Sequence, residues 1–262
     1  MPASDGHEGL MTFGGHLEEL RRVLFRIIGV AGTLAAIVFS LKDTTWRILL
    51  APGEHGFVTY RLIERLAHSA GIHGFRFTEY HVELIATDLS SQFMSHVTTS
   101  VYLGLLGASP YILYELFRFV SPALYAGERR HALRALTVIY ALFLFGVFMS
   151  YYVLFPVSFR FLGTYSVSSR VHSMITLDSY VSTFTTLTLA LGLVFQLPVI
   201  AFVLGRMGMV TPSLLSRYRR HAFLLIMVVS AVITPPDLMT LVLVALPLYL
   251  LYELSIVVTR WA

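Results

Sequence analysis

Two short segments, each with a candidate glutamate, carry the residues best suited to chemistry in this chain. The first is His16-Leu17-Glu18-Glu19-Leu20-Arg21, and the second is Gly127-Glu128-Arg129-Arg130. A carboxylate accepts two hydrogen bonds from the planar guanidinium group of arginine, a geometry that the ammonium group of lysine cannot copy. Glu19 and Glu128 are therefore candidates for binding two adjacent arginines. Alternatively, both are only helix-start acids, with Glu19 paired to Arg22 three residues on.

Signatures of enzymatic catalysis are absent from the sequence. It contains no GK[ST] phosphate loop and no GxGxxG, GxSxG or HExxH motif. The ten histidines are scattered, without the spacing of metal ligands, and there is no cysteine for a disulfide or a thiolate site. We therefore expect a protein that is not an enzyme and has no metal site and no cofactor.

The composition predicts that lipid surrounds most of the chain. Hydrophobic residues make up 56% of the sequence and charged residues only 13%, about half the charged fraction of a soluble domain. A helix needs about 20 apolar residues to cross the hydrocarbon core. Six apolar segments are candidates: 23–41, 97–117, 133–155, 184–204, 222–234 and 238–258. The predicted fold class is an all-α membrane protein, a single domain of six transmembrane helices of which the last two are short.

The fifth segment, 222–234, is too short to cross a standard bilayer upright, since 13 residues make about 20 Å of helix. Pro235-Pro236-Asp237 follows it and predicts a tight turn, because proline disfavours a helix at the residue before it. Either the bilayer is thinner here or the turn lies below the far surface. A buried hairpin made of the last two segments is the alternative.

Arginines in the short loops predict the orientation. Most lie on one side of the predicted membrane: Arg21, Arg22, Arg118, Arg129, Arg130, Arg134, Arg206, Arg217, Arg219, Arg220 and Arg260. The basic side is the cytoplasm, so residues 1–22 and the C-terminus are both expected there. The long loop 42–96 is then external. Within it, Leu62, Ile63, Leu66 and Ala67 have helical spacing, which predicts a helix over 60–70 that lies on the membrane surface or caps the bundle.

Six segments resemble the TatC family, the multi-spanning receptor of the twin-arginine protein translocase. They are HLEELR at 16–21, SPALYAGERR at 121–130, Thr87-Asp88-Leu89, GLVFQLP at 192–198, TPPD at 234–237 and PLYLLYE at 247–253. The resemblance covers nearly the whole chain in order and includes the six-span topology. External Pro52 and Tyr180 also match family positions, whereas the external loop 42–96 is longer than is usual in the family.

This resemblance implies a receptor in the bacterial cytoplasmic (inner) membrane. Members of the family bind the Arg-Arg motif of signal peptides on folded precursors at the cytoplasmic face. They assemble single-span TatA and TatB partners, and the proton-motive force drives export, in keeping with the absent phosphate loop. No nucleic acid is implied as a partner, and whether several copies form a homo-oligomer stays open.

The resemblance also implies roles for particular residues. It assigns signal-peptide binding to Glu19 and Glu128, with Phe119 packing on the peptide and Arg21 orienting a carboxylate. In the predicted fourth span the family usually has glutamate where this chain has Gln196. Glutamine cannot titrate, but it can hydrogen-bond to a partner helix or to a neighbouring helix of the bundle.

Two further acids accompany the last span. Asp237 is expected to be the N-cap of that helix, and the resemblance adds a role in partner contact or peptide insertion. Glu253 is expected to reach the membrane surface or to pair with Arg26. The alternative function is a secondary transporter with Gln196 and Asp237 as ligands, although the inverted repeats and paired broken helices of that class are not evident. A scaffold without a ligand of its own is the third reading.

Overall fold

The chain is helical in nearly every segment that the structure describes. The structure is a computed structural model that describes residues 13–71, 83–120, 129–166, 168 and 174–261. The α-helices are α1 (Phe13–Ser40), α2 (Lys42–Leu50), α3 (Val58–Ser69), α4 (Ser91–Val120), α5 (Arg129–Met149), α6 (Phe155–Thr164), α7 (Leu177–Val194), α8 (Leu197–Arg206), α9 (Pro212–Arg217), α10 (Arg219–Ile233) and α11 (Leu238–Val258). A π-helical segment, Ser150–Leu154, joins α5 to α6, and short 3-10 turns cover Ala51–Gly53 and Thr259–Trp261. Strands β1 (Leu84–Ile85) and β2 (Ile175–Thr176) form one parallel pair.

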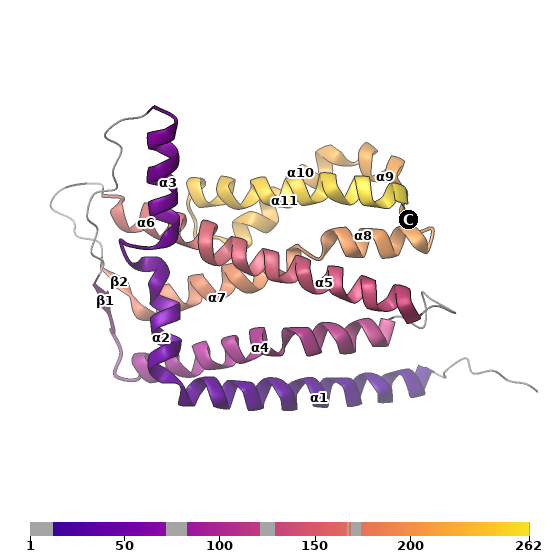
Figure 1. Cartoon of the computed structure of the whole chain (residues 1–262), viewed down its shortest axis with the longest axis horizontal. Helices are drawn as coiled ribbons and strands as arrows, with labels where there is room; N and C mark the ends of the chain where they lie inside the picture. The colour runs from indigo at the N-terminus through magenta and orange to yellow at the C-terminus, as the bar shows by residue number, and fades with distance from the viewer. Residues whose placement is uncertain (1–12, 72–82, 121–128, 167, 169–173, 262) are drawn as a thin grey trace, which may run out of the picture.

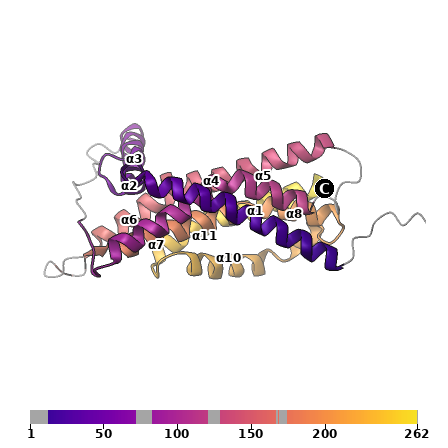
Figure 2. The ribbon, with the colours of Figure 1, turned by 90° about the horizontal axis from the view of Figure 1, so that it is seen from below.

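The long helices lie side by side along one axis, as Figure 1 shows. At one end α2 and α3 lie across this axis, and in the perpendicular view of Figure 2 α3 is seen end-on. The beginning of α1 and the end of α11 lie at the opposite end. The predicted 60–70 helix is confirmed as α3, whereas α2 was not predicted.

Four helical stretches in the described residues are long and apolar enough to cross a membrane: Leu17–Ser40, Leu136–Thr164, Leu177–Arg206 and Leu238–Trp261. The predicted all-α class is thereby confirmed. α4 and α10 lie over the other two predicted segments, and their role as spans stays a prediction, as does the cytoplasmic position of the ends. α10 has 15 residues, or about 22 Å of helix, and its turn into α11 stops short of the outer end of α7 (Figure 1).

The core lies where α2, α6, α7 and α11 meet. The ring of Phe155 lies edge-on to Tyr180 and to Phe184, with centroid distances of 5.0 Å in both cases. The Tyr180 hydroxyl donates a hydrogen bond of 2.8 Å to the carbonyl of Leu49 at the end of α2. Leu248 on α11 is buried in the same cluster. These contacts fix the end of the molecule where α2 and α3 lie across the axis, the transverse end, to the bundle.

The predicted fourth span, 184–204, contains a break. α7 ends at Val194 and α8 begins at Leu197, with Pro198 in its first turn. Proline has no backbone N–H and tolerates only the first turn of a helix. Gln196 lies in this break, where its backbone N–H donates to the carbonyl of Leu193 and its carbonyl accepts from Val199 and Ile200.

The pairing of α1 with α4 positions the functional site. α1 packs mainly against α4, and the contact is close because Gly104 faces the backbone of Ala35. A Cβ atom built on Gly104 would lie 2.5 Å from the Ala35 nitrogen. The two helices run in opposite directions, so the first turns of α1 lie beside the last turns of α4 (Figures 1 and 2).

Candidate functional site

A polar pocket of about 380 Å³ lies between the beginning of α1 and the end of α4. Residues spaced three or four apart share one face of a helix, and this spacing explains the lining. α1 contributes Glu18, Glu19, Arg22, Val23 and Arg26, and α4 contributes Glu115, Arg118 and Phe119. The structure thus brings together Glu19 and Phe119, two of the predicted site residues, from segments about a hundred positions apart in the sequence.

Glu115 is the buried acid of this pocket. Its side chain is 5% exposed, and its Oε1 lies 3.6 Å from Nη1 of Arg26. The same oxygen accepts a hydrogen bond of 2.8 Å from the hydroxyl of Tyr111, one turn earlier on α4. A buried charge is tolerated when it is paired and hydrogen-bonded. Glu115 therefore brings negative charge into the pocket wall, with Arg26 as its counter-ion.

Glu19 is the acid of the pocket that belongs to neither of its described ion pairs. Arg22 pairs with Glu18 at 2.7 Å, four residues before it, so the predicted pairing of Glu19 with Arg22 is wrong. The side chain of Glu19 is exposed. Because Glu19 also lines the pocket, a cation that enters can reach its carboxylate.

The other predicted site residues, Arg21 and Glu128, are not among the described residues that line the pocket. The guanidinium of Arg21 lies over the ring of Phe25, 5.6 Å from its centroid, and Arg21 does not line the pocket. Glu128 falls outside the residues that the structure describes. Its position relative to Glu19 stays a prediction.

Sequence reasoning missed Glu115 and misassigned Arg26. Arg26 pairs with Glu115, whereas Glu253 pairs with Arg219 at 2.9 Å. The expected pairing of Glu253 with Arg26 is therefore wrong. The signal for Glu115 was present, because a carboxylate within an apolar segment demands a partner.

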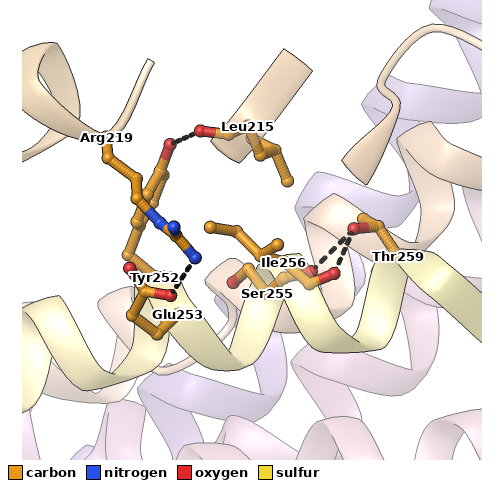
Figure 3. A network of polar contacts seen from close by, with 7 residues as sticks. All are labelled: Leu215, Arg219, Tyr252, Glu253, Ser255, Ile256 and Thr259. Carbon is orange, nitrogen blue, oxygen red and sulfur yellow. Dashed lines mark hydrogen bonds and ion pairs between the residues drawn. The ribbon is translucent and has the colours of Figure 1, made fainter. Parts of the chain in front are cut away.

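The Glu253 pair belongs to a network that ties the end of α11 to α9 and α10, as Figure 3 shows. Beside it, the Tyr252 hydroxyl donates a hydrogen bond of 2.7 Å to the carbonyl of Leu215. One turn further on, the Thr259 hydroxyl bonds to the carbonyls of Ser255 and Ile256. These contacts hold the last turns of α11 and its 3-10 extension in place.

Gln196 and Asp237 both have partners within the chain. Nε2 of Gln196 donates a hydrogen bond of 3.1 Å to the carbonyl of Ile139 on α5, so this side chain bridges two helices of the bundle. Oδ1 of Asp237 accepts a hydrogen bond of 2.7 Å from the backbone N–H of Thr240. The prediction that Asp237 is the N-cap of the last helix is confirmed.

Comparison with known proteins identifies the family. The family described as "Sec-independent protein translocase protein (TatC)" matches residues 15–247, a range that includes both walls of the pocket. The chain belongs to the TatC family. It is therefore a membrane protein and a subunit of the Tat translocase, a family of transport components that are not enzymes.

Relatives and solved structures agree with this membership. The TatC protein of Blattabacterium sp. subsp. Periplaneta americana is 30% identical over 252 residues, which cover 95% of both chains. The TatCy protein of Bacillus subtilis is 41% identical over 160 residues, 61% of this chain and 63% of that one. A solved structure titled "Crystal Structure of Twin Arginine Translocase Receptor- TatC" is 30% identical, with a TM-score of 0.74, and covers 94% of this chain and 98% of its own.

Proposed function

We propose that this chain is the receptor of the twin-arginine translocase and that the pocket between α1 and α4 binds the paired arginines of signal peptides on folded precursors. The observation that carries the proposal is the meeting of Glu19 and Phe119 in one polar pocket, whose lining balances three glutamates with three arginines and leaves Glu19 outside both described ion pairs. Support also comes from the solved relatives, whose titles name a twin-arginine translocase receptor.

The chemistry of the pocket suits a guanidinium group. The exposed Glu19 carboxylate offers two oxygens to the planar fork of an arginine, and Glu115 contributes negative charge behind it. The ring of Phe119 adds a face on which a guanidinium or an apolar side chain of the peptide can pack. Each hydrogen bond to a charged group contributes roughly 1.5–3 kcal/mol, or about ten- to a hundredfold in affinity.

The second arginine of the motif is assigned to Glu128. This residue follows α4 in the sequence and directly precedes Arg129, the first residue of α5. The end of α4 carries Phe119 and one wall of the pocket. Arg21 was expected to orient a carboxylate; because its guanidinium lies over the ring of Phe25 and it does not line the pocket, the proposal assigns it no contact with the arginine pair.

We place the pocket on the cytoplasmic face of the bacterial inner membrane. Arginines gather at this end of the molecule, among them Arg22, Arg118 and Arg219, and basic loops stay in the cytoplasm. Six spans then put both termini on that side. In the proposed export cycle, TatA- and TatB-type single-span proteins assemble with this chain and the proton-motive force drives transport. We propose that the polar groups that contact these partners are those of Gln196, Asp237 and Glu253.

Binding of a fluorescent Arg-Arg signal peptide to the full chain in lipid nanodiscs tests the proposal. We expect Glu19→Gln to weaken binding about ten- to a hundredfold, whereas the matched variant Glu54→Gln, exposed in the turn between α2 and α3, leaves binding unchanged. A peptide with two lysines should bind the parent chain as weakly as the Arg-Arg peptide binds Glu19→Gln. Unchanged affinity in the double variant Glu19→Gln/Glu128→Gln, with an unchanged melting temperature, would falsify the proposal.

A further inference from the structure

The apolar face of helix α3 is only partly covered by the rest of the chain. Thr59 and Tyr60 are buried, and Ile63 and Ala67 are half-buried against the bundle. Next to them, Val58, Leu62 and Leu66 are 53%, 53% and 59% exposed. These three residues are spaced four apart, so they form one continuous stripe along the helix. The stripe has no cover among the described residues.

The beginning of α3 is fixed to the π-helical segment after α5. The Thr59 hydroxyl donates a hydrogen bond to the carbonyl of Tyr152, and the Tyr60 hydroxyl donates to the carbonyls of Pro52 and Pro156 at 3.1 and 2.9 Å. The ring of Phe57 stacks on Tyr152 with a centroid distance of 5.7 Å. These contacts set the direction of α3, which lies across the axis of the long helices and hence in the plane of a membrane that they cross (Figures 1 and 2).

The same contacts set the depth of α3. Tyr152 lies three residues before the end of the predicted span 133–155, and tyrosines gather at the boundary between hydrocarbon and water. The ring of Tyr152 also meets Phe148, an exposed residue of α5, at 6.2 Å. The lipid-facing surface of this span is therefore continuous with α3. The helix begins at the level of the membrane interface, not above it.

Two arginines flank the stripe. Arg61 and Arg65 are exposed and one turn apart, and on a helical wheel they lie on the edge next to Val58. Among the described residues neither guanidinium forms an ion pair within the chain. Long basic side chains beside an apolar stripe reach up to phosphate oxygens while their stems stay in apolar surroundings.

We propose that α3 is an interfacial lipid-binding helix in the leaflet on the side opposite the pocket. Val58, Leu62 and Leu66 enter the boundary between headgroups and acyl chains, and Arg61 and Arg65 bind the phosphates of anionic lipids. A helix with an apolar face and arginines at its polar edge is stable in this plane. Such an anchor holds the transverse end of the molecule against the bilayer, and it does not depend on what the pocket binds.

Site-directed spin labelling of the full chain tests the proposal, since the sequence has no cysteine to remove. Single variants Leu62→Cys and Leu66→Cys place labels on the stripe. His68→Cys, exposed on the polar side of the helix, seven residues after Arg61 and away from Leu62 and Leu66, is the control. In nanodiscs of phosphatidylcholine with an equal amount of phosphatidylglycerol, we expect the ratio of oxygen to nickel-complex accessibility to be several-fold higher at positions 62 and 66 than at 68.

The arginines are tested in the same samples. Removing phosphatidylglycerol should make the label at position 62 shallower, and Arg61→Gln/Arg65→Gln should abolish this lipid dependence. Equal accessibility at all three labelled positions would overturn the interfacial placement. Dipolar coupling between labels at position 62 on two copies would show that a second copy covers the stripe, which also overturns it. A lipid dependence that survives in the double variant would remove the phosphate contacts from the proposal.

Discussion

Glu115 has a side chain that is 5% exposed, and its ion-pair partner in the pocket is Arg26 at 3.6 Å. Replacing Arg26 by glutamine removes this counter-ion and leaves the hydroxyl of Tyr111 as the described partner of a buried carboxylate. A buried polar group that loses its partner costs about 1–3 kcal/mol. We therefore expect Arg26→Gln to lower the free energy of unfolding by about that amount, measured by denaturant unfolding of the chain in detergent.

The pair Arg22–Glu18 is a matched control on the same helix. Its side chains are 68% and 64% exposed, and exposed ion pairs contribute about 0–1 kcal/mol. Arg22→Gln should hence change the stability little, while Arg26→Gln/Glu115→Gln should recover most of the loss. If Arg22→Gln and Arg26→Gln lower the free energy of unfolding equally, burial of Glu115 does not explain the contribution of its ion pair to stability.

At the scale of single residues, the sequence predicted which residues belong to the site better than it predicted which side chains pair with one another. Glu19 and Phe119 were placed in one site because Glu19 lies in one segment that resembles the family and Phe119 lies just before another, and the structure brings them together. Arg26 was paired with the wrong acid, since a sequence does not tell which helices are neighbours. Once α1 packs on α4, Glu115 lies within reach of Arg26 and Glu253 does not.

At the scale of elements, the contact between α1 and α4 controls the shape of the pocket. A methyl group on Gly104 would lie 2.5–2.8 Å from backbone and side-chain atoms of Ala35, and backbone cannot rotate away. We expect Gly104→Ala to push α1 off α4 and to cost about 1–3 kcal/mol of stability. Thermal unfolding measures the loss, and peptide binding should weaken in parallel, because both helices line the pocket.

Gly107 supplies the comparison for that experiment. It lies three residues further along α4, and a methyl group there would meet only Leu34 Cδ1 at an ordinary 3.6 Å. Gly107→Ala should leave stability and binding unchanged or slightly raise stability, because alanine favours a helix over glycine. If both variants behave alike, helix propensity and not the close approach at Ala35 decides the outcome.

Elements were predictable where their pattern was strong. α3 was expected from the spacing of Leu62, Ile63 and Leu66, and it forms over Val58–Ser69. α2 was missed because it is only nine residues long, is rich in polar residues and begins directly after α1. The break between α7 and α8 was also missed, since an apolar run shows composition but not continuity, and only Pro198 hinted at it.

At the scale of the whole molecule, α3 and the pocket lie at opposite ends of the bundle. The pocket lies where α1 begins and α4 ends, and α2 and α3 lie at the other end (Figure 1). The sequence predicted this polarity from its arginines. The depth of each segment could not be predicted, because the tilt and length of α10 depend on packing against α11.

Cysteine accessibility in cells shows which end of the molecule faces the cytoplasm. Gly56, in the turn before α3, has open space around it, and Ser213 on α9 is exposed at the pocket end. In the cysteine-free chain, we expect a membrane-impermeant maleimide to label Gly56→Cys in cells whose outer membrane or cell wall has been permeabilised. Ser213→Cys should react only after the inner membrane is disrupted, because six spans leave α9 in the cytoplasm. Reaction of Ser213→Cys in intact spheroplasts, with Gly56→Cys protected, would invert the molecule and place the pocket where no unexported precursor can reach it.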